Sequence, residues 1–312
     1  MNTLHFKYAV EVERTRSITQ AAENLFMAQP NLSKAIKELE DTIGISIFER
    51  TSKGVTPTRK GAEFLVYAKN ILAEIERMES LYIPDNCDRQ SLNISIPRGS
   101  YISSAFTDFI AELDPEKEID VHLNETNSMQ SITNVVDGQF NMGIIRYQIA
   151  YENYFLDYLA EKNLSFEPIW KFECLALMSR NHPLASREKV TYKALSQCIE
   201  IVHGDTLVPY LSARKTKTPH SSPEIRRKIS LYERFSQFDI LSRIPTTYIW
   251  VSPIPEHILT QYNLIQRKCY GANQKYKDVL IYPKGYVFTE LDKRFIHCLY
   301  ASKNQVEAME YT

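Results

Sequence analysis

Polar side chains on one face of a predicted helix have the chemistry to bind nucleic acid. The helix is expected to begin near Gln29 and to end at Gly44, because apolar residues recur at helical spacing at Leu32, Ile36, Leu39 and Ile43. Its opposite face carries an amide, a hydroxyl and two ammonium groups, from Gln29, Ser33, Lys34 and Lys37. Amides pair with base edges, and hydroxyls and lysines hold phosphates. Taken alone, the same pattern also fits an ordinary solvent-exposed helix face.

A second group of basic and polar residues follows this helix. Apolar stretches at Ile47–Arg50 and Val55–Thr56 flank the polar tip Thr51–Gly54, which is the pattern of a small β-hairpin. Arg50 and Lys53 make the hairpin basic, so it is a candidate wing that reaches DNA beside the helix. Acidic residues nearly cancel the positive charge of this region, and they are Glu38, Glu40, Asp41 and Glu49.

Two shorter helices are expected before the polar face. The first ends near Thr15 and is predicted by the helical spacing of Phe6, Ala9 and Val10. The second begins after Ser17, which forms a capping-box pair with Gln20, and its apolar face consists of Ile18, Ala21, Ala22 and Leu25. Short helices with a tight turn before the last one are typical of a helix-turn-helix domain.

The order of these residues resembles the N-terminal domain of LysR-type transcriptional regulators. The matching positions are Ser17, Ile18, Thr19, Gln20, Ala21, Ala22, Leu25, Gln29, Pro30, Ser33, Ile36, Leu39, Glu40, Gly44, Phe48, Arg50, Thr58 and Gly61. The resemblance implies that double-stranded DNA is bound by Ser17, Thr19, Gln29, Pro30, Ser33, Lys34, Lys37, Arg50, Lys53 and Thr58. Two positions depart from the family pattern: Ala28 stands where Ser or Thr is usual, and Lys53 where Arg is frequent.

A long joining helix is expected from the cap Thr58 to the breaker Pro84. Its apolar residues suggest a coiled-coil seam that is formed by Leu65, Ala68, Leu72, Ile75 and Tyr82. The alternative is a single helix that lies on its own domain. The family resemblance implies that this helix forms a homodimer, with a homotetramer as a further possibility.

Alternating strand and helix patterns after residue 92 predict α/β structure with a largely parallel sheet. The strand patterns lie at Leu92–Ile96, Ile119–Leu123, Met142–Ile145, Glu173–Met178, Ile199–Val202, Tyr248–Val251 and Val279–Tyr282. The run Gly138–Ile144 and the turn His182–Ala185 resemble the two-lobed, periplasmic-binding-protein-like sensor domain of LysR-type regulators. We therefore expect a winged helix-turn-helix at 1–58, a linker helix at 59–83, a hinge at 84–91 and an effector-binding domain at 92–312. Lobe one is expected at about 92–165 and 273–312, and lobe two at about 166–272.

Candidate effector-binding residues lie where predicted strands give way to helices. Ser100 and Ser128 are at such positions, and Arg98 and Arg146 are close by. An arginine can hold a carboxylate by two hydrogen bonds. The resemblance implies an effector cleft between the lobes, and we expect a small anion there, bound by Arg98, Ser100, Ser128, Arg146, His203 and Thr247. The alternative is that the hydroxyls only cap helices and the arginines face solvent.

Catalytic and cofactor motifs are not found in the sequence. It has no Gly-x-Ser-x-Gly, P-loop or dinucleotide fingerprint, and its histidines have no metal-ligand spacing. His203 and Asp205 lie two residues apart, which is far short of a catalytic pair. We therefore expect a DNA-binding regulator without enzyme activity, cofactor or metal. The alternatives are a ligand-independent DNA-binding protein and a solute-binding module.

Composition fits a globular protein of more than one domain. The chain has 312 residues and a formal net charge of −1, so bulk charge does not indicate nucleic-acid binding. Five cysteines lie far apart, which fits reduced thiols. The first residues do not form a signal peptide, and no apolar run reaches the ~20 residues of a membrane span. We expect a cytoplasmic protein.

Overall fold

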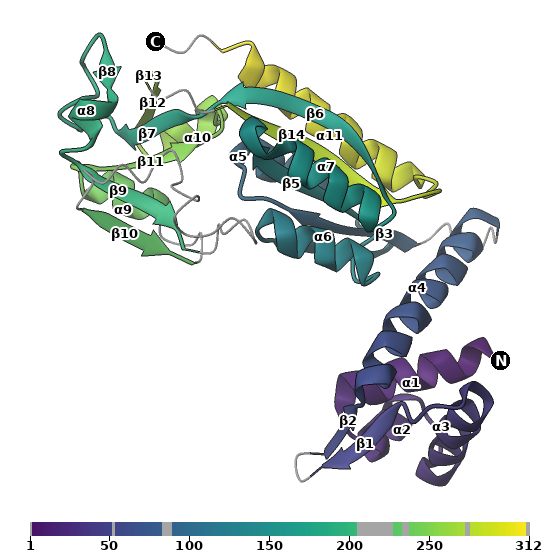
Figure 1. The fold of residues 1–312 in the computed structure, drawn as a ribbon. Helices are drawn as coiled ribbons and strands as arrows, with labels where there is room; N and C mark the ends of the chain where they lie inside the picture. Colours follow the sequence, from purple (N-terminus) through teal and green to yellow (C-terminus); the bar gives the residue numbers. More distant parts are fainter. Residues whose placement is uncertain are drawn as a thin grey trace. The chain divides into compact units, whose positions relative to one another are not determined.

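The chain folds into two compact units (Figure 1). The N-terminal unit comprises residues 1–89 with 136–140, and the C-terminal unit comprises residues 90–135 with 141–312. The computed structural model describes residues 2–51, 54–82, 89–204, 227–232, 237–271 and 275–309. The predicted fold class is confirmed, since a winged helix-turn-helix and a long helix precede two α/β lobes. The predicted domain boundaries stay predictions.

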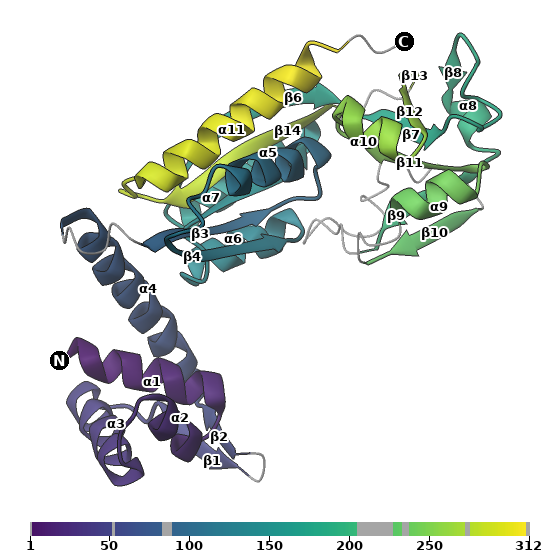
Figure 2. The same ribbon diagram turned by 180° about the vertical axis from the view of Figure 1, so that it is seen from behind.

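The N-terminal unit packs its helices around one apolar core. Its elements are α1 (Thr3–Thr15), α2 (Ile18–Asn24), α3 (Gln29–Ile43), β1 (Phe48–Thr51), β2 (Gly54–Pro57) and α4 (Arg59–Tyr82). In Figure 2, α1, α2 and α3 lie together beside the β1–β2 hairpin. The core includes Phe6, Val12, Leu32, Leu39 and Ile47, each less than 5% exposed.

The residues that cap these helices are those that the sequence predicts in most places. Gly44 ends α3 with a φ of 72°, a left-handed conformation that costs glycine little. Ser17 caps α2, because its hydroxyl accepts a hydrogen bond from Gln20 N at 3.3 Å. The reciprocal half of the capping box is not formed, since the Gln20 side chain donates to Asn24 instead.

The predicted coiled-coil seam on the joining helix is wrong for three of its residues. Leu65, Ala68 and Leu72 are at most 9% exposed and belong to the core of their own N-terminal unit, where α4 packs on α1. Helical periodicity alone does not say which surface an apolar stripe covers. Ile75 is half-buried, and the side chain of Tyr82 lies outside the described residues. A different face of α4 exposes large apolar groups, which are Tyr67, Ile71 and Met78.

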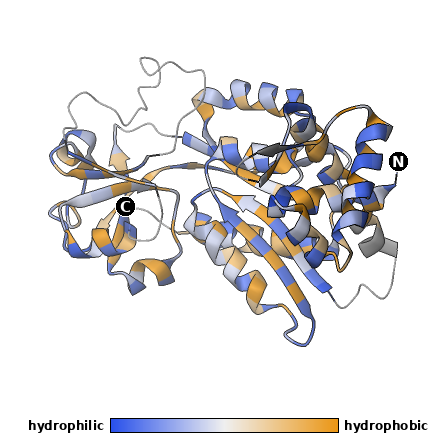
Figure 3. Cartoon of the chain, turned by 90° about the horizontal axis from the view of Figure 1, so that it is seen from below, coloured by the Kyte–Doolittle hydropathy of each residue, from blue (hydrophilic) through white to orange (hydrophobic). Residues whose placement is uncertain are grey.

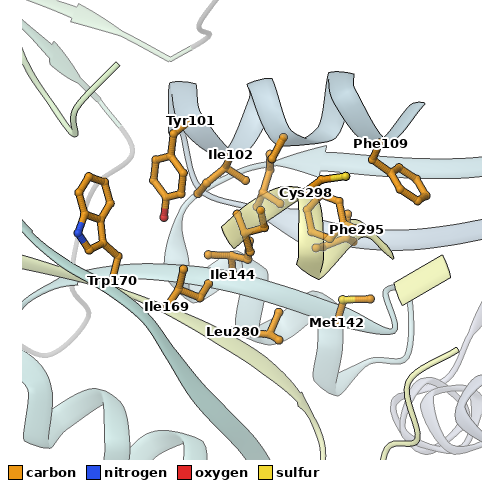
Figure 4. Close-up of a cluster of buried hydrophobic side chains, with 14 of the residues drawn as sticks. Tyr101, Ile102, Phe109, Met142, Ile144, Ile169, Trp170, Leu280, Phe295 and Cys298 are labelled. Atoms are coloured by element: carbon orange, nitrogen blue, oxygen red, sulfur yellow. The ribbon is translucent and has the colours of Figure 1, made fainter. Parts of the chain in front are cut away.

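Lobe one of the C-terminal unit is built on a sheet with the strand order β4-β3-β5-β14-β6. The strands are β3 (Arg89–Ile96), β4 (Glu118–Glu125), β5 (Met142–Gln148), β6 (Leu164–Glu173) and β14 (Lys275–Pro283). The helical elements are α5 (Ser100–Ala111), α6 (Ser128–Val136), η2 (Ile149–Tyr151), α7 (Glu152–Glu161) and α11 (Glu290–Glu307). Figure 4 shows part of its core, with Tyr101 and Trp170 at one end and Phe109 at the other.

Lobe two has a sheet with the strand order β10-β9-β11-β7-β12 and a short β13-β8 pair. The strands are β7 (Leu175–Ser179), β8 (Val190–Thr191), β9 (Ile199–His203), β10 (Lys228–Leu231), β11 (Thr247–Val251), β12 (Leu264–Arg267) and β13 (Cys269–Tyr270). The helices are α8 (Tyr192–Leu195), α9 (Gln237–Arg243) and α10 (Glu256–Gln261). Hydrophilic and hydrophobic segments alternate along the helices of the chain, as one-sided burial requires (Figure 3).

The sheets differ from the sequence prediction in two respects. They are mixed rather than largely parallel, because β14 runs antiparallel to β5 and β6, and β7 runs antiparallel to β11 and β12. Strand β6 pairs with β14 along its length, so residues 166–173 lie in the sheet of lobe one, where the sequence analysis placed the start of lobe two. Within the described ranges, no helix is long and apolar enough to cross a membrane.

The two faces of α4 generate a paired prediction. Leu72→Asp places a charge in the core of the N-terminal unit and should lower its stability by about 3–5 kcal/mol. Ile71→Asp, at a position that is 42% exposed, should change the stability of the single chain by less than about 1 kcal/mol at protein concentrations too low for a dimer. Chemical denaturation followed by circular dichroism measures both, and equal losses would contradict this packing.

Candidate functional site

The α2 and α3 helices of the N-terminal unit begin beside an open hollow of about 560 Å³. The hollow is lined by Thr15, Arg16, Ser17, Ile18, Thr19, Gln29, Gly54 and Val55. It therefore brings together three of the predicted DNA-binding residues, Ser17, Thr19 and Gln29, with the first residues of strand β2. Backbone amides at helix starts are donors for anions such as phosphate.

Backbone contacts fix the hairpin against the corner between α1 and α2. Arg16 has a left-handed conformation with a φ of 53°, and its carbonyl accepts a hydrogen bond from Val55 N at 3.0 Å. A side chain at Gly54 would put a Cβ 2.6 Å from this carbonyl oxygen, so glycine permits the approach. At the other end of the hairpin, a Cβ at Gly61 would lie 1.9 Å from Ile47 O. The wing is thus positioned by main-chain contacts together with the Glu40 carboxylate, which accepts hydrogen bonds from Ile47 N at 2.6 Å and Phe48 N at 3.1 Å.

The exposed face of α3 carries the predicted recognition residues. Gln29 and Pro30 are exposed at its first turn, and Gln29 Nε2 donates a hydrogen bond to Ser33 Oγ at 2.9 Å. Lys34 and Lys37 are exposed, and Lys34 Nζ lies 3.8 Å from the Glu38 carboxylate. Ala28 stands where the family usually has Ser or Thr, and it gives α3 no side-chain cap. The backbone amides at the start of α3 therefore have no hydroxyl at this position to bond.

The other three predicted DNA-binding residues lie outside the exposed face of α3. The Thr58 hydroxyl donates to Ser46 O at 2.7 Å and accepts from Gly61 N at 2.9 Å, so it caps the joining helix as expected. The Arg50 side chain and Lys53 lie outside the described residues. Their roles in DNA binding stay predictions.

Lobe one holds Arg146 in an internal ion pair. Arg146 Nε and Nη2 each donate to one oxygen of Asp278 at 2.7 Å, and Nη1 donates to Arg98 O at 3.0 Å. The guanidinium lies over the Phe172 ring, 4.8 Å from its centroid. The guanidinium fork thus binds a carboxylate of its own chain, and the expected role of Arg146 toward an effector stays a prediction.

Burial defines the electrostatics of this ion pair. Asp278 is fully buried, and the fully buried Tyr101 hydroxyl donates to Asp278 Oδ2 at 2.5 Å. Burial by itself would lower the pKa of Arg146, but the adjacent Asp278 carboxylate raises it above its usual range. Burial and the same carboxylate raise the pKa of Tyr101. Arg146 therefore stays charged beside Asp278.

The remaining effector candidates are also engaged within the protein. The Ser128 hydroxyl donates to Arg146 O at 2.7 Å and accepts from Arg146 N at 2.9 Å. Ser100 is buried at the start of α5, and Arg98 Nη2 donates to Tyr232 O at 2.9 Å. His203 is half-buried at the end of β9, before Asp205, which lies outside the described residues.

Thr247 is buried at the first residue of β11. Its side chain is fully buried, and its hydroxyl donates to Ile244 O at 2.7 Å. The hydroxyl therefore bonds its own turn, and a role of Thr247 in effector binding stays a prediction.

Sequence reasoning missed Asp278 and Tyr101. Asp278 sits inside a strand pattern of apolar residues, and an acidic residue in a buried strand is itself a signal that a cation lies opposite. The register pairs Asp278 with Arg146 across β14 and β5.

The cysteines in the described part of the chain lack the environment of reactive thiols. Burial raises the pKa of Cys174 to about 12 and that of Cys269 to about 11. Burial also raises the pKa of Cys198 and Cys298. Reactive cysteines need the opposite shift. Among the described residues, no three His, Cys, Asp or Glu side chains gather as metal ligands do.

The ion pair generates a stability prediction. Arg146→Ala leaves Asp278 buried without its cation and should lower stability by about 3–5 kcal/mol in a denaturant titration. The matched control is Arg180→Ala, whose partner Glu256 is 60% exposed, and it should cost less than about 1 kcal/mol. A loss from Arg146→Ala no larger than that of the control would show that the pair is not what holds these elements.

Comparison with known proteins identifies the N-terminal unit. Residues 4–62 match the family model of the bacterial regulatory helix-turn-helix proteins, lysR family. A probable RuBisCO transcriptional regulator from Trieres chinensis is 31% identical over 179 residues, which cover 56% of this chain and 54% of that protein. The matched region thus spans about half the length of that relative.

Solved structures resemble the whole chain at low sequence identity. Full-length OxyR from Pseudomonas aeruginosa, solved as a cysteine-to-aspartate variant, superposes with a TM-score of 0.64 and 15% identity, covering 97% of this chain and 94% of that one. Full-length LysG from Corynebacterium glutamicum with bound effector Arg superposes with a TM-score of 0.59 and 12% identity. The superposition covers 98% of this chain and 99% of that one. These likenesses show the fold of the chain, and the N-terminal unit carries the helix-turn-helix of the lysR family.

Proposed function

We propose that this protein is a sequence-specific DNA-binding transcriptional regulator whose C-terminal unit responds to a small molecule. The observation that carries the first part is the exposed Gln29–Ser33 pair at the start of α3, beside the hollow that Ser17 and β2 line. The amide and hydroxyl are held in one arrangement before DNA arrives, which lowers the entropic cost of base contacts. Among the alternatives, an enzyme has no support from the family.

A homodimer would give the regulator two DNA-reading heads. We propose that the α4 face with Tyr67, Ile71 and Met78 pairs with a second copy, in place of the seam first expected, because these large apolar side chains are exposed in one chain. Two copies of α3 would then meet two half-sites. Sedimentation of the Ile71→Asp variant tests the pairing, and an undisturbed dimer would exclude this face.

The effector is proposed to be a small anion in the C-terminal unit. Arg146 already binds Asp278, so Arg98 is proposed as the main cation that binds the effector. Arg98 is half-buried beside the starts of α5 and α6. LysG, which shares the fold, was solved with an effector bound. A ligand-independent DNA-binding protein is the competing possibility.

Calorimetry of the whole protein against small carboxylates, amines and sugars tests the effector proposal. We expect a carboxylate to bind, and Arg98→Ala to weaken it by about tenfold or more, as loss of a charge-assisted hydrogen bond does. DNA affinity without ligand should not change in this variant. Binding of only neutral or cationic compounds would reject an anion.

Operator binding separates base contacts from phosphate contacts. Using operator fragments selected from genomic DNA by the purified protein, Gln29→Ala should cost about 1–3 kcal/mol and relax sequence choice. Lys34→Ala should weaken binding to all sequences alike and lower the salt slope by about one. The control is Lys193→Ala, an exposed lysine on α8, which should alter neither.

Two results would go against this assignment of the DNA surface. One is an unchanged operator preference in Gln29→Ala. The other is a loss of affinity in Lys193→Ala as large as in Lys34→Ala.

A further inference from the structure

Lobe two buries a carboxylate for which the proposed function has no use. Glu200 lies in the middle of β9 and is fully buried. The strand register places it between Lys228 of β10 and Tyr248 of β11. Tyr248 belongs to an apolar cluster with Ala176, Met178, Leu184, Val190 and Leu195. A carboxylate on this side of the sheet is therefore surrounded mainly by hydrocarbon.

Compensation for the Glu200 charge is weak. The Lys228 ammonium lies 3.7 Å from Glu200 Oε2, beyond normal hydrogen-bond length. In the described ranges, neither Glu200 oxygen accepts a hydrogen bond of normal geometry, and the buried Tyr248 hydroxyl has none either. The other titratable groups near Glu200 and Tyr248 are phenols and thiols, from Tyr192, Cys198 and Cys269.

The consequence is an unusually basic carboxyl group. Burial raises the pKa of Glu200 to about 7 from its ordinary value of 4.5, while Lys228 and the indole of Trp250 offset part of the rise. The neighbouring thiols do not compete for the proton in this range, because burial raises the pKa of Cys198 and of Cys269.

The position of Glu200 connects it to the contact between the lobes. Strand β10 is the edge strand of the sheet and pairs with β9, so its departure would admit water to Glu200. The Lys228 side chain on β10 is 33% exposed already. The residue after β10 is Tyr232, whose carbonyl accepts the hydrogen bond from Arg98 of lobe one at 2.9 Å.

We propose that Glu200 makes lobe two responsive to protons: when Glu200 loses its proton, the β10 edge loosens, and the contact of Tyr232 with Arg98 loosens with it. A buried, poorly paired carboxylate gains free energy on reaching water, so any opening that hydrates it is favoured once it is charged. The response does not depend on DNA binding, and it can be measured whether or not the proposed regulator function holds.

The sign of the stability effect follows from linkage. A carboxyl group whose pKa is raised by folding contributes stability that is present below pH 4.5 and is lost as the pH rises through about 7. The wild type should therefore lose stability between pH 5 and pH 8 that Glu200→Gln keeps. Glu256→Gln, at an exposed carboxylate of the same lobe, is the control and should behave as the wild type.

Tryptophan fluorescence can follow the protonation of Glu200. The chain has two tryptophans, and Trp250 is the one that affects the Glu200 pKa, so the Trp170→Phe protein isolates its signal. Its emission should titrate with a midpoint near 7. Glu200→Gln should abolish the transition, and Lys228→Met should move the midpoint upward, because the cation that favours the charged form is lost.

Hydrogen exchange tests the loosening of β10. In the full-length protein, exchange of the segment 228–232 is compared between wild type and Glu200→Gln at the same pH. The ratio of the two opening constants should rise by up to about tenfold from pH 6 to pH 8. A ratio that does not change with pH, or a Trp250 titration that survives Glu200→Gln, would overturn the proposal.

Discussion

The Arg146–Asp278 ion pair is the interaction on which the architecture of lobe one depends. One guanidinium joins β5 to β14 through both Asp278 oxygens and reaches the loop before α5 through Arg98 O. The backbone of Arg146 holds the Ser128 hydroxyl at the start of α6. Buried charges are costly unless every hydrogen-bonding position is used, and here the carboxylate also accepts from Tyr101. The pair therefore places the starts of both helices relative to β5 and β14.

The N-terminal unit relies on a different device, which is close approach of main chain to main chain. Gly54 and Gly61 allow strand β2 and helix α4 to come against the carbonyls of Arg16 and Ile47. Such contacts leave Thr19 and Gln29 exposed beside the hollow, so their polar groups are available to a partner. Lobe one shows the reverse case, because the side chains expected to bind a ligand there are themselves structural.

Local signals in the sequence predicted the helix-turn-helix well. The features that depend on contacts between residues far apart in the sequence were predicted less well. The stripe of α3, the Gly44 cap and the Ser17 cap depend on residues within a few positions of each other. The role of Arg146 depends on a partner 132 residues away, which no spacing rule reveals. The seam on α4 failed for a related reason, since periodicity identifies an apolar face but not the surface that covers it. The buried Thr247 and the mixed sheets likewise follow from tertiary packing.

The burial of Leu65, Ala68 and Leu72 makes the first turns of α4 a rigid extension of the DNA-reading head. One core contains residues of both α3 and this part of α4, so the two helices are held together as one body. In a pair of such heads, the angle and separation of the two α3 helices would be set by the turn of α4 at which the copies meet. The exposed side of α4 would thus determine the spacing of the half-sites that a pair of heads can bind. A change in that spacing would have to arise in the part of α4 that follows Leu72.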